Sequence, residues 1–214
     1  YHKAQKLFAD KGMKVDRPAM HMVFTGNPGT AKTTVARLFA RIMRENGLLS
    51  RGHLVEVGRG DLVGKYVGWT AQTVQKRFEQ AEGGVLFIDE AYNLAPPSKG
   101  GGGSDDKEGV EAVESLMTRM ENDKGKFVVI CAGYQKNMDE FLLINPGLSR
   151  RFTNKMHIDD YTPDQLEQIF IQMAKKKNYT IVPEAILPLQ KCIYQKVDAK
   201  DENFGNAGEM VKLF

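Results

Sequence analysis

The sequence contains only two cysteines and no long uninterrupted hydrophobic run. Two cysteines cannot form a disulfide framework, and the absence of a Cys-x-x-Cys pair favours a reducing compartment. Cys131 and Cys192 both fall in apolar segments, where cysteine packs as a small hydrophobic residue. No run approaches the ~20 apolar residues of a membrane-spanning helix, and no signal peptide opens the chain. We therefore expect a cytoplasmic protein without a membrane partner.

The chain also lacks a strong excess of charge of either sign. Its 30 Lys and Arg residues and 27 Asp and Glu residues give a formal net charge of +3. This surplus is too small and too dispersed to favour nucleic acid as a partner. The only tight basic run, 175–177, is typical of a solvated helix face. A chain of 214 residues can bury about 70% of its unfolded surface, so folding requires neither a disulfide nor a structural metal.

Short apolar runs alternate with segments of helical periodicity up to about residue 160. This alternation is typical of a parallel sheet covered by helices, which predicts an α/β sandwich of three layers with five strands. The expected strands are 21–24, 53–57, 85–88, 127–131 and 155–158. The expected helices are 33–45, with Val35, Leu38, Phe39, Ile42 and Met43 on one face, 70–81 with Val74 and Phe78 inward, and a third with the stripe Val110, Val113, Met117 and Met120.

The composition changes after Tyr161. Thr162-Pro163-Asp164 is a helix-start signal, a second helix is expected near Pro183, and Asn206 is expected to cap a third. Pro188 should kink the second helix or delay its start. We therefore divide the chain into an α/β domain at 1–160 and a small helical domain at 161–214, which looks truncated. The stretch 95–108, rich in proline and glycine, is predicted to be a mobile loop.

A phosphate-binding pattern lies between the first strand and the first helix. The string Gly26-Asn27-Pro28-Gly29-Thr30-Ala31-Lys32-Thr33 follows G-x-x-x-x-G-K-[ST], except that Ala31 replaces the second glycine. Small residues let backbone N–H groups turn toward phosphates, and the helix N-terminus adds partial positive charge. We predict that 27–33 and Thr34 bind ATP, that Lys32 reaches the β- and γ-phosphates, and that the Thr33 hydroxyl ligates Mg²⁺. The methyl group of Ala31 costs little at negative φ and about 1 kcal/mol or more at positive φ.

A second motif supplies two acids at the end of the third apolar run. Val85 to Ile88 reads as a buried strand that delivers Asp89 and Glu90 to the carboxyl edge of the sheet. Asp89 is expected to act on the magnesium ion, and Glu90 to orient and deprotonate the attacking water. An acid pair of this kind argues against a small-molecule kinase, in which a second substrate replaces water.

With these motifs the chain resembles the AAA+ ATPases, and within them the CbxX/CfxQ-like group containing red-type Rubisco activase, stage V sporulation protein K and the cytosolic ATPase of type VII secretion. The resemblance runs from about residue 20 to the end. It is carried by 26–30 (GNPGT), 52–55 (GHLV), 61–64 (DLVG), 66–68 (YVG), 84–92 (GVLFIDEAY), 132–134 (AGY), 145–148 (NPGL) and 204–207 (FGNA).

The resemblance implies a P-loop domain with a helical lid, ring oligomers that are usually hexamers, and ATP-driven pulling on a protein threaded through the central pore. It places Tyr66-Val67-Gly68 in the first pore loop and 95–108 in the second. Arg151 matches the arginine finger that reaches the neighbouring subunit's nucleotide, with Arg150 as the other candidate.

Two positions depart from the usual AAA+ pattern. Tyr134, expected to contact the nucleotide, stands where many members have the sensor 1 asparagine. Gly208 stands where the lid usually carries the sensor 2 arginine, and this predicts weakened coupling between ATP state and lid angle.

Three functions remain open at this point. The first is an ATP-hydrolysing remodelling motor, and the second is a scaffold or regulatory domain that binds ATP with impaired hydrolysis. The third is a P-loop kinase. Tyr66 as a core aromatic, and the two arginines as a surface cluster, are the corresponding structural alternatives. The sequence does not indicate which protein would be remodelled.

Overall fold

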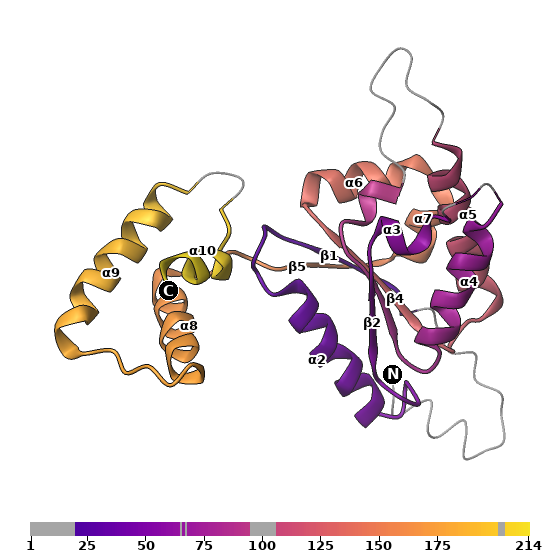
Figure 1. Ribbon diagram of the computed structural model, residues 1–214. Coiled ribbons are helices and arrows are strands. Elements are labelled where there is room, and N and C mark those ends of the chain that lie inside the picture. Colours follow the sequence, from indigo (N-terminus) through magenta and orange to yellow (C-terminus); the bar gives the residue numbers. More distant parts are fainter. Residues whose placement is uncertain (1–19, 65, 67, 95–105, 201–203) are drawn as a thin grey trace, which may run out of the picture.

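The computed structural model describes residues 20–64, 66, 68–94, 106–200 and 204–214. Five parallel strands form one sheet in the order β2-β3-β4-β1-β5. Helices lie on both faces of the sheet, and the last helices form a separate lid beyond β5 (Figure 1). The predicted α/β sandwich with a parallel five-stranded sheet and a helical lid is confirmed.

The element boundaries lie close to the predicted ranges. The strands are β1 (Met22–Thr25), β2 (Leu54–Val57), β3 (Val85–Ile88), β4 (Val128–Gly133) and β5 (Asn154–His157). The helices of the body are α2 (Lys32–Glu45), α3 (Arg59–Leu62), α4 (Thr70–Ala81), the 3₁₀ turn η1 (Ala91–Leu94), α5 (Lys107–Asn122), α6 (Gln135–Ile144) and α7 (Pro146–Arg151). The lid consists of α8 (Pro163–Lys176), α9 (Pro183–Asp198) and α10 (Ala207–Leu213).

The two faces of the sheet support two separate hydrophobic cores. Successive strand residues point to opposite faces, so Ile88 and Cys131 pack in the core formed with α3 to α7. Phe87 and Ile130 pack on the other face, where α2 supplies the covering side chains. Both central strands, β3 and β4, are buried along their whole length. The carboxyl ends of β1 and β3, which precede the two nucleotide motifs, are thereby fixed at one edge of a rigid sheet.

The buried face of α2 differs from the predicted one. Leu38 and Ile42 are 54% and 46% exposed, whereas Ala36, Ala40 and Met43 are buried. Val35, Phe39 and Met43 of the predicted face do pack against the core. Ala36 and Ala40, one turn apart, line the contact in place of Leu38 and Ile42, so periodicity identified the helix and most of its buried face correctly.

Two smaller expectations also need correction. Val110 was expected in the buried stripe of α5, but it is 48% exposed while Val113 and Met120 are buried. Pro188 was expected to kink α9 or delay its start; the start is not delayed, because the helix begins at Pro183, as expected, and continues through Pro188 to Asp198. The N-terminal proline is Pro183, at the first helical position, where its missing N–H has no intrahelical partner to lose.

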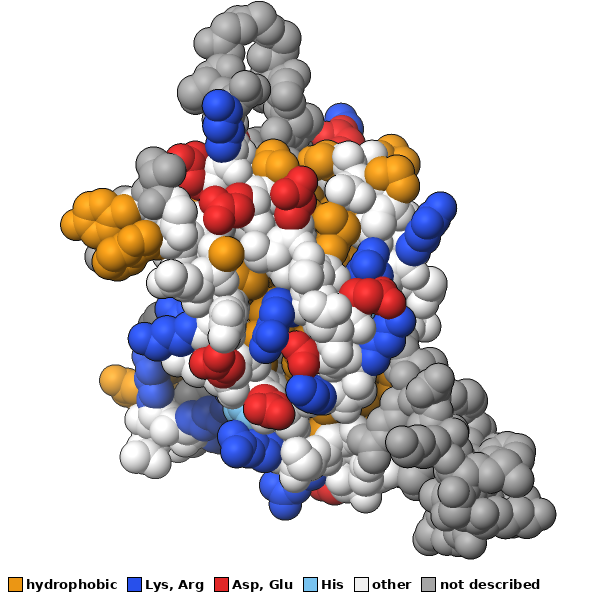
Figure 2. Space-filling view, turned by 90° about the vertical axis from the view of Figure 1, so that its right-hand side faces the viewer, with side chains coloured by type: hydrophobic (Ala, Val, Ile, Leu, Met, Phe, Trp, Pro, Cys, Tyr) orange, Lys and Arg blue, Asp and Glu red, His pale blue; other side chains and the backbone are white. Residues whose placement is uncertain are grey.

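The surface over the body helices carries charges of both signs. Figure 2 shows basic and acidic side chains interleaved on this face, with small hydrophobic patches between them. Several of these charges are paired, including Arg77 with Asp61 at 2.7 Å and Arg119 with Asp123 at 3.1 Å. Within the described ranges, no helix combines the length and apolar character needed to span a bilayer.

Candidate nucleotide-binding site

The phosphate-binding loop connects β1 to α2 at the carboxyl edge of the sheet. The Gly26 amide donates to the Gly133 carbonyl of β4 at 3.3 Å, which ties the start of the loop to the neighbouring strand. The Thr30 hydroxyl donates to the Asn27 carbonyl at 2.8 Å and closes the loop on itself. Helix α2 has no side-chain cap at its N-terminus. Its first backbone N–H groups therefore remain available for an anion, as at other phosphate-binding helix ends.

Ala31 adopts the left-handed conformation, with φ 66° and ψ 31°. From the sequence alone, the cost of the Ala31 methyl group depends on the sign of φ. Because φ is positive here, the methyl group is strained. Glycine has no Cβ and would occupy this conformation without that cost. The Ala31 carbonyl nevertheless accepts from the Val35 amide at 2.9 Å, so α2 starts in register at Lys32.

The predicted phosphate and metal residues lie around one cavity of about 330 Å³. Its walls come from the loop, the start of α2, the end of β3 and the end of β4. The lining residues are Pro28, Gly29, Ala31, Lys32, Thr33, Thr34, Asp89, Glu90, Gly133 and Tyr134. Asn27 and Thr30 were also predicted to bind ATP, but they are absent from this lining. The Asn27 side chain instead donates to Asp160 at 3.0 Å, and Thr30 is buried within the loop.

Lys32 is the cation of this cavity. Its Nζ donates to the carbonyls of Gly26 and Asn27, both at 2.8 Å, so the side chain folds back over the loop. Burial lowers the pKa of Lys32, while the charges of Asp89 and Glu90 act in the opposite direction. This interaction shows that the lysine lies within electrostatic reach of both acids.

Glu90 is held in an uncommon backbone conformation, with φ 47°. Its carboxylate accepts from the Asn93 side-chain amide at 3.0 Å, and its own amide donates to Asp89 Oδ1 at 3.1 Å. Desolvation, with a further contribution from Glu90, raises the pKa of Tyr92 to about 12. Strained non-glycine residues that are held by their surroundings concentrate at active sites. The acid thus has a defined position at the open rim of the cavity.

The oxygen donors of the cavity fit magnesium. Mg²⁺ prefers oxygen ligands and is usually held by one or two carboxylates together with substrate phosphates and waters. The cavity offers the Thr33 hydroxyl and the Asp89 carboxylate, one from α2 and one from the end of β3. Among the residues that the structure describes, no group of three or more His, Cys, Asp or Glu side chains forms an all-protein cage. A site completed by nucleotide phosphates is the arrangement that this donor set supports.

Comparison with known families agrees with this geometry. Residues 22–160 match the model of the ATPase family associated with various cellular activities (AAA), and residues 162–214 match the AAA lid domain. The chain belongs to the AAA ATPase family. The match to the AAA family covers the sheet, the helices α2 to α7, the phosphate-binding motif and the acidic motif. The match to the lid domain covers α8 to α10.

Curated relatives place the chain in a narrower part of the AAA family. It is 46% identical over 177 residues to stage V sporulation protein K of Bacillus subtilis, covering 83% of this chain and 53% of the relative. It is 42% identical over 198 residues to a chloroplastic ribulose bisphosphate carboxylase/oxygenase activase of Cyanidioschyzon merolae, covering 92% and 64%. It is 44% identical over 180 residues to the ESX-1 secretion system protein EccA1 of Mycobacterium leprae, covering 84% and 31%. The chain thus spans less than two thirds of the length of these relatives.

The two candidate finger arginines of the AAA domain lie outside its own cavity. Arg151 ends α7 and is ion-paired with Glu121 at 3.1 Å, and it also donates to the Gly147 carbonyl at 3.1 Å. Arg150 is exposed on the same helix. Arg151 lines a different hollow of about 550 Å³ between α5 and α7, together with Glu121 and Asn145.

Tyr66 of the predicted first pore loop lies on the surface of the AAA domain. Tyr66 is 66% exposed, which excludes the alternative of a core aromatic. Its ring meets Trp69 edge-on at 5.0 Å between centroids, and the Trp69 amide donates to the Tyr66 carbonyl at 3.1 Å. Gly68 has φ 81°, the positive value that a tight turn requires of its third residue and that glycine adopts freely. Val67 lies outside the described residues.

Most of the predicted second pore loop, 95–105, also lies outside the described residues. Its last part was expected to be loop, but α5 already begins at Lys107, because Asp106 caps the helix by accepting from the Gly109 amide at 3.0 Å. Arg59 binds Asp106 through two hydrogen bonds of 2.7 and 2.8 Å and also donates to the Leu94 carbonyl at 3.0 Å. One guanidinium thus holds the two described ends of this segment together.

The lid position expected to carry the sensor 2 arginine is open. Gly208 lies in the first turn of α10, and a Cβ atom built there would have no neighbour within 4 Å. The side chain of Lys212, one helical turn further on, is engaged within α10, where its Nζ donates to the Glu209 carboxylate at 2.6 Å. Tyr134, at the sensor 1 position, lines the cavity as predicted.

Sequence reasoning missed several residues that shape this site. Asn93 and Tyr92 belong to η1, a turn too short to leave a periodic pattern, yet both act on Glu90. Asp160 binds Asn27 of the loop from the far end of the AAA domain. Of these residues, only Tyr92 carried a signal in the sequence, because it is the last residue of the family string 84–92.

Proposed function

We propose that this AAA domain binds ATP with Mg²⁺ and hydrolyses it. The observation that carries the proposal is the single cavity lined by the phosphate loop, Lys32, Thr33, Asp89 and Glu90. A domain that only stored nucleotide would have no need of an acid held in a strained conformation at the cavity rim. Family membership points in the same direction.

Each residue of the cavity has a distinct task in this mechanism. The free N–H groups at the start of α2 and the Lys32 ammonium bind and orient the β- and γ-phosphates. Thr33 and Asp89 hold the magnesium ion, which neutralises charge on the phosphate oxygens when it is bound. Glu90 orients a water for in-line attack and takes its proton at a carboxylate oxygen. Asn93 fixes the direction of that carboxylate by donating to it at 3.0 Å.

We further propose that the active form is a ring, with six subunits as the expected number. An arginine from α7 of one subunit would reach the nucleotide of the next and stabilise charge on the transferring phosphoryl group. The position of Arg150 and Arg151 away from their own cavity supports action across a subunit boundary.

The work done by the ring is proposed to be remodelling of a protein chain. The exposed Tyr66, presented on a turn between α3 and α4, is suited to pack against an extended polypeptide. One relative is named as an activase of a carboxylase and another as a secretion system protein, and both names fit a protein client. The identity of the client would reside in parts of the protein that differ between relatives.

Phosphate release by the purified protein with Mg²⁺ and ATP tests hydrolysis directly. Glu90→Gln keeps the size and hydrogen bonding of the side chain but removes the base, and should slow turnover by at least about 100-fold. Glu82→Gln, an exposed acid at the end of α4, is the matched control and should leave the rate unchanged. Slow turnover that is insensitive to Glu90→Gln would support the alternative of a nucleotide-binding scaffold.

Mixing of variants tests the ring. Arg151→Ala subunits keep an intact cavity, and Glu90→Gln subunits keep an intact arginine, so each alone should be inactive. A mixture should recover part of the activity, because one kind of boundary then combines both intact parts. The same mixture made with Arg150→Ala assigns the finger. Recovery with neither arginine variant would contradict catalysis across the boundary.

A further inference from the structure

Asn206 is a fully buried polar residue at the junction of the lid and the phosphate loop. It precedes α10 with φ 46° and ψ −120° and has no exposed surface. Its Nδ2 lies within hydrogen-bond distance of three acceptors, Asp160 Oδ1 at 2.9 Å and the carbonyls of Pro28 at 3.1 Å and Phe204 at 3.2 Å, which share its two hydrogens. Its Oδ1 accepts from the Tyr161 amide at 2.9 Å. One side chain therefore joins three segments that are far apart in sequence.

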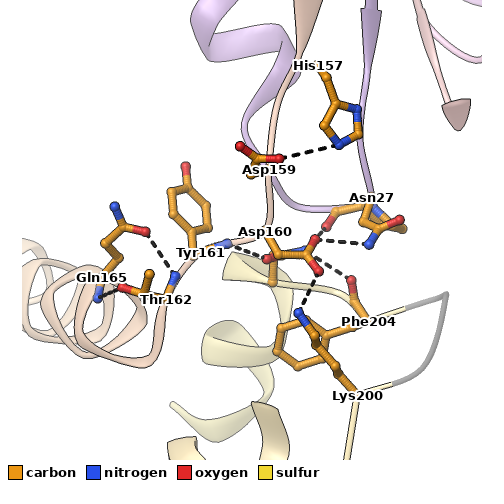
Figure 3. A network of polar contacts seen from close by, with 11 residues as sticks. Asn27, His157, Asp159, Asp160, Tyr161, Thr162, Gln165, Lys200 and Phe204 are labelled. Atoms are coloured by element: carbon orange, nitrogen blue, oxygen red, sulfur yellow. Dashed lines mark hydrogen bonds and ion pairs between the residues drawn. The ribbon is translucent and has the colours of Figure 1, made fainter. Parts of the chain in front are cut away.

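Asp160 is the second member of this junction. Figure 3 shows it between Asn27 of the phosphate loop and Lys200 of the lid. Its Oδ1 accepts from Asn27 at 3.0 Å as well as from Asn206, and its Oδ2 accepts from Lys200 at 3.2 Å. Partial burial raises the pKa of Asp160, but the hydrogen bonds from Asn206, Asn27 and Lys200 outweigh that effect and leave the pKa lowered. The three donors thus stabilise the charged form of the Asp160 carboxylate.

The backbones of the lid and the loop also touch directly. A Cβ atom at Gly29, whose φ is 70°, would lie only 2.1 Å from the Gly205 carbonyl oxygen and 3.1 Å from the Gly208 amide nitrogen. The Ala207 amide donates to the Gly29 carbonyl at 3.4 Å. Packed backbone of this kind transmits displacement, because neither segment can shift without meeting the other.

These contacts address what couples the lid to the nucleotide in this chain. An arginine at position 208 would connect the lid to the γ-phosphate, but Gly208 has no side chain. The remaining side-chain connections run from Asn206 directly to the Pro28 carbonyl and, through Asp160, to Asn27 of the phosphate loop.

We propose that Asn206 and Asp160 are positioning residues that couple the lid to the main chain of the phosphate loop. The lid then follows the conformation of the loop rather than a contact with the γ-phosphate. The functional half of this inference rests on the proposed nucleotide binding by the loop, whereas the mechanical half concerns the protein alone. The weakened coupling expected from Gly208 stays a prediction, and this junction is the route by which the remaining coupling would act.

Two variants of the intact chain approach the junction from opposite sides. Asn206→Gly removes the amide and keeps a residue that tolerates φ 46°. Asn27→Ala removes the contact with Asp160 from the loop side. Gln190→Ala is the matched control, since Gln190 binds Glu167 inside the lid at 3.0 Å and makes none of the contacts of the junction. Asp160→Asn provides a milder change that retains the size of the side chain.

The readout is hydrogen–deuterium exchange of nucleotide-free protein, followed by titration with Mg²⁺ and ATP. Asn206→Gly should speed exchange across 26–34 by about tenfold, and Asn27→Ala should do the same in α10. The double variant should change exchange by less than the sum of the two single variants, because each substitution removes a donor from the same Asp160 oxygen. Gln190→Ala should alter neither segment, and nucleotide affinity should fall about tenfold in Asn206→Gly.

The proposal would be overturned if Asn206→Gly speeded exchange only in the lid and left exchange in the phosphate loop unchanged. Strictly additive effects in the double variant would overturn it as well. If Asn206→Gly fails to fold, the Asn27→Ala and Asp160→Asn measurements decide the question in the same way. Absence of nucleotide binding by the unsubstituted protein would refute the proposed function alone, because the exchange measurement needs no nucleotide.

Discussion

Replacing Ala31 with glycine should stabilise the protein, although Ala→Gly changes usually destabilise. Ala31 sits at φ 66°, where an L-residue loses roughly 1–2 kcal/mol relative to the right-handed region. Glycine avoids that cost but gives the unfolded chain more freedom, which offsets about 0.4–1 kcal/mol. The expected net gain is about 0.8 kcal/mol in the free energy of unfolding. For a chain of this size that raises the Tm by about 2–3 °C.

Urea and thermal unfolding of Ala31→Gly and of two comparison variants measure this effect. Ala36→Gly, one turn into α2, has ordinary helical backbone and a buried methyl group, so it should lose about 1 kcal/mol or more. Gly29→Ala should be the most harmful of the three, since its Cβ would overlap the Gly205 carbonyl oxygen. If Ala31→Gly destabilised the protein as much as Ala36→Gly, the left-handed conformation at Ala31 would be refuted.

Three further predictions concern the lid, the pore loop and the response to acid. A side chain at position 208 meets no neighbour within 4 Å of its Cβ, so Gly208→Arg should raise nucleotide affinity and turnover. An unchanged rate together with an unchanged affinity would contradict the prediction that Gly208 weakens the coupling between lid and nucleotide. Tyr66→Ala should retain basal hydrolysis but lose stimulation by an unfolded polypeptide; Trp69, the single tryptophan of the chain, reports polypeptide binding by fluorescence, and equal stimulation of both proteins would contradict the pore-loop role. Burial, with help from the charge of Arg151, lowers the pKa of His21 to about 4. Between pH 6.5 and 4, His21 binds a proton in the unfolded state but not in the folded state. As the pH decreases through this range, the free energy of unfolding should therefore fall by about 1.4 kcal/mol per pH unit. His21→Gln should reduce that slope in urea unfolding, and an identical slope would count against it.

The sequence was sufficient for the parts of the fold that have local signals. The buried strands β3 and β4 contain the continuous apolar runs 85–88 and 128–132, and the loop before Lys32 follows the spacing of residues that phosphate binding requires. The short elements α3, η1 and α7 were not predicted, because a turn or two of helix with mixed polarity leaves no period to detect. Helix α6, of ten residues, was not predicted either, although its buried residues Met138, Phe141 and Leu142 recur at helical spacing.

Other features depend on contacts that no local pattern contains. The sign of φ at Ala31 decides its cost, and only the three-dimensional loop reveals it. Leu38 and Ile42 look like core residues by their chemistry, yet the sheet meets α2 along its alanines. The bond between Asp160 and Asn206 joins residues on either side of two lid helices, so its partners cannot be matched by spacing.

A crystal structure with Mg²⁺ and a non-hydrolysable ATP analogue tests the central claim most directly. The account predicts the β- and γ-phosphates against the N–H groups at the start of α2 and beside Lys32, with the metal between the Thr33 hydroxyl and the Asp89 carboxylate. Nucleotide bound at another place, or a triphosphate in the cavity with its metal remote from Asp89, would contradict it.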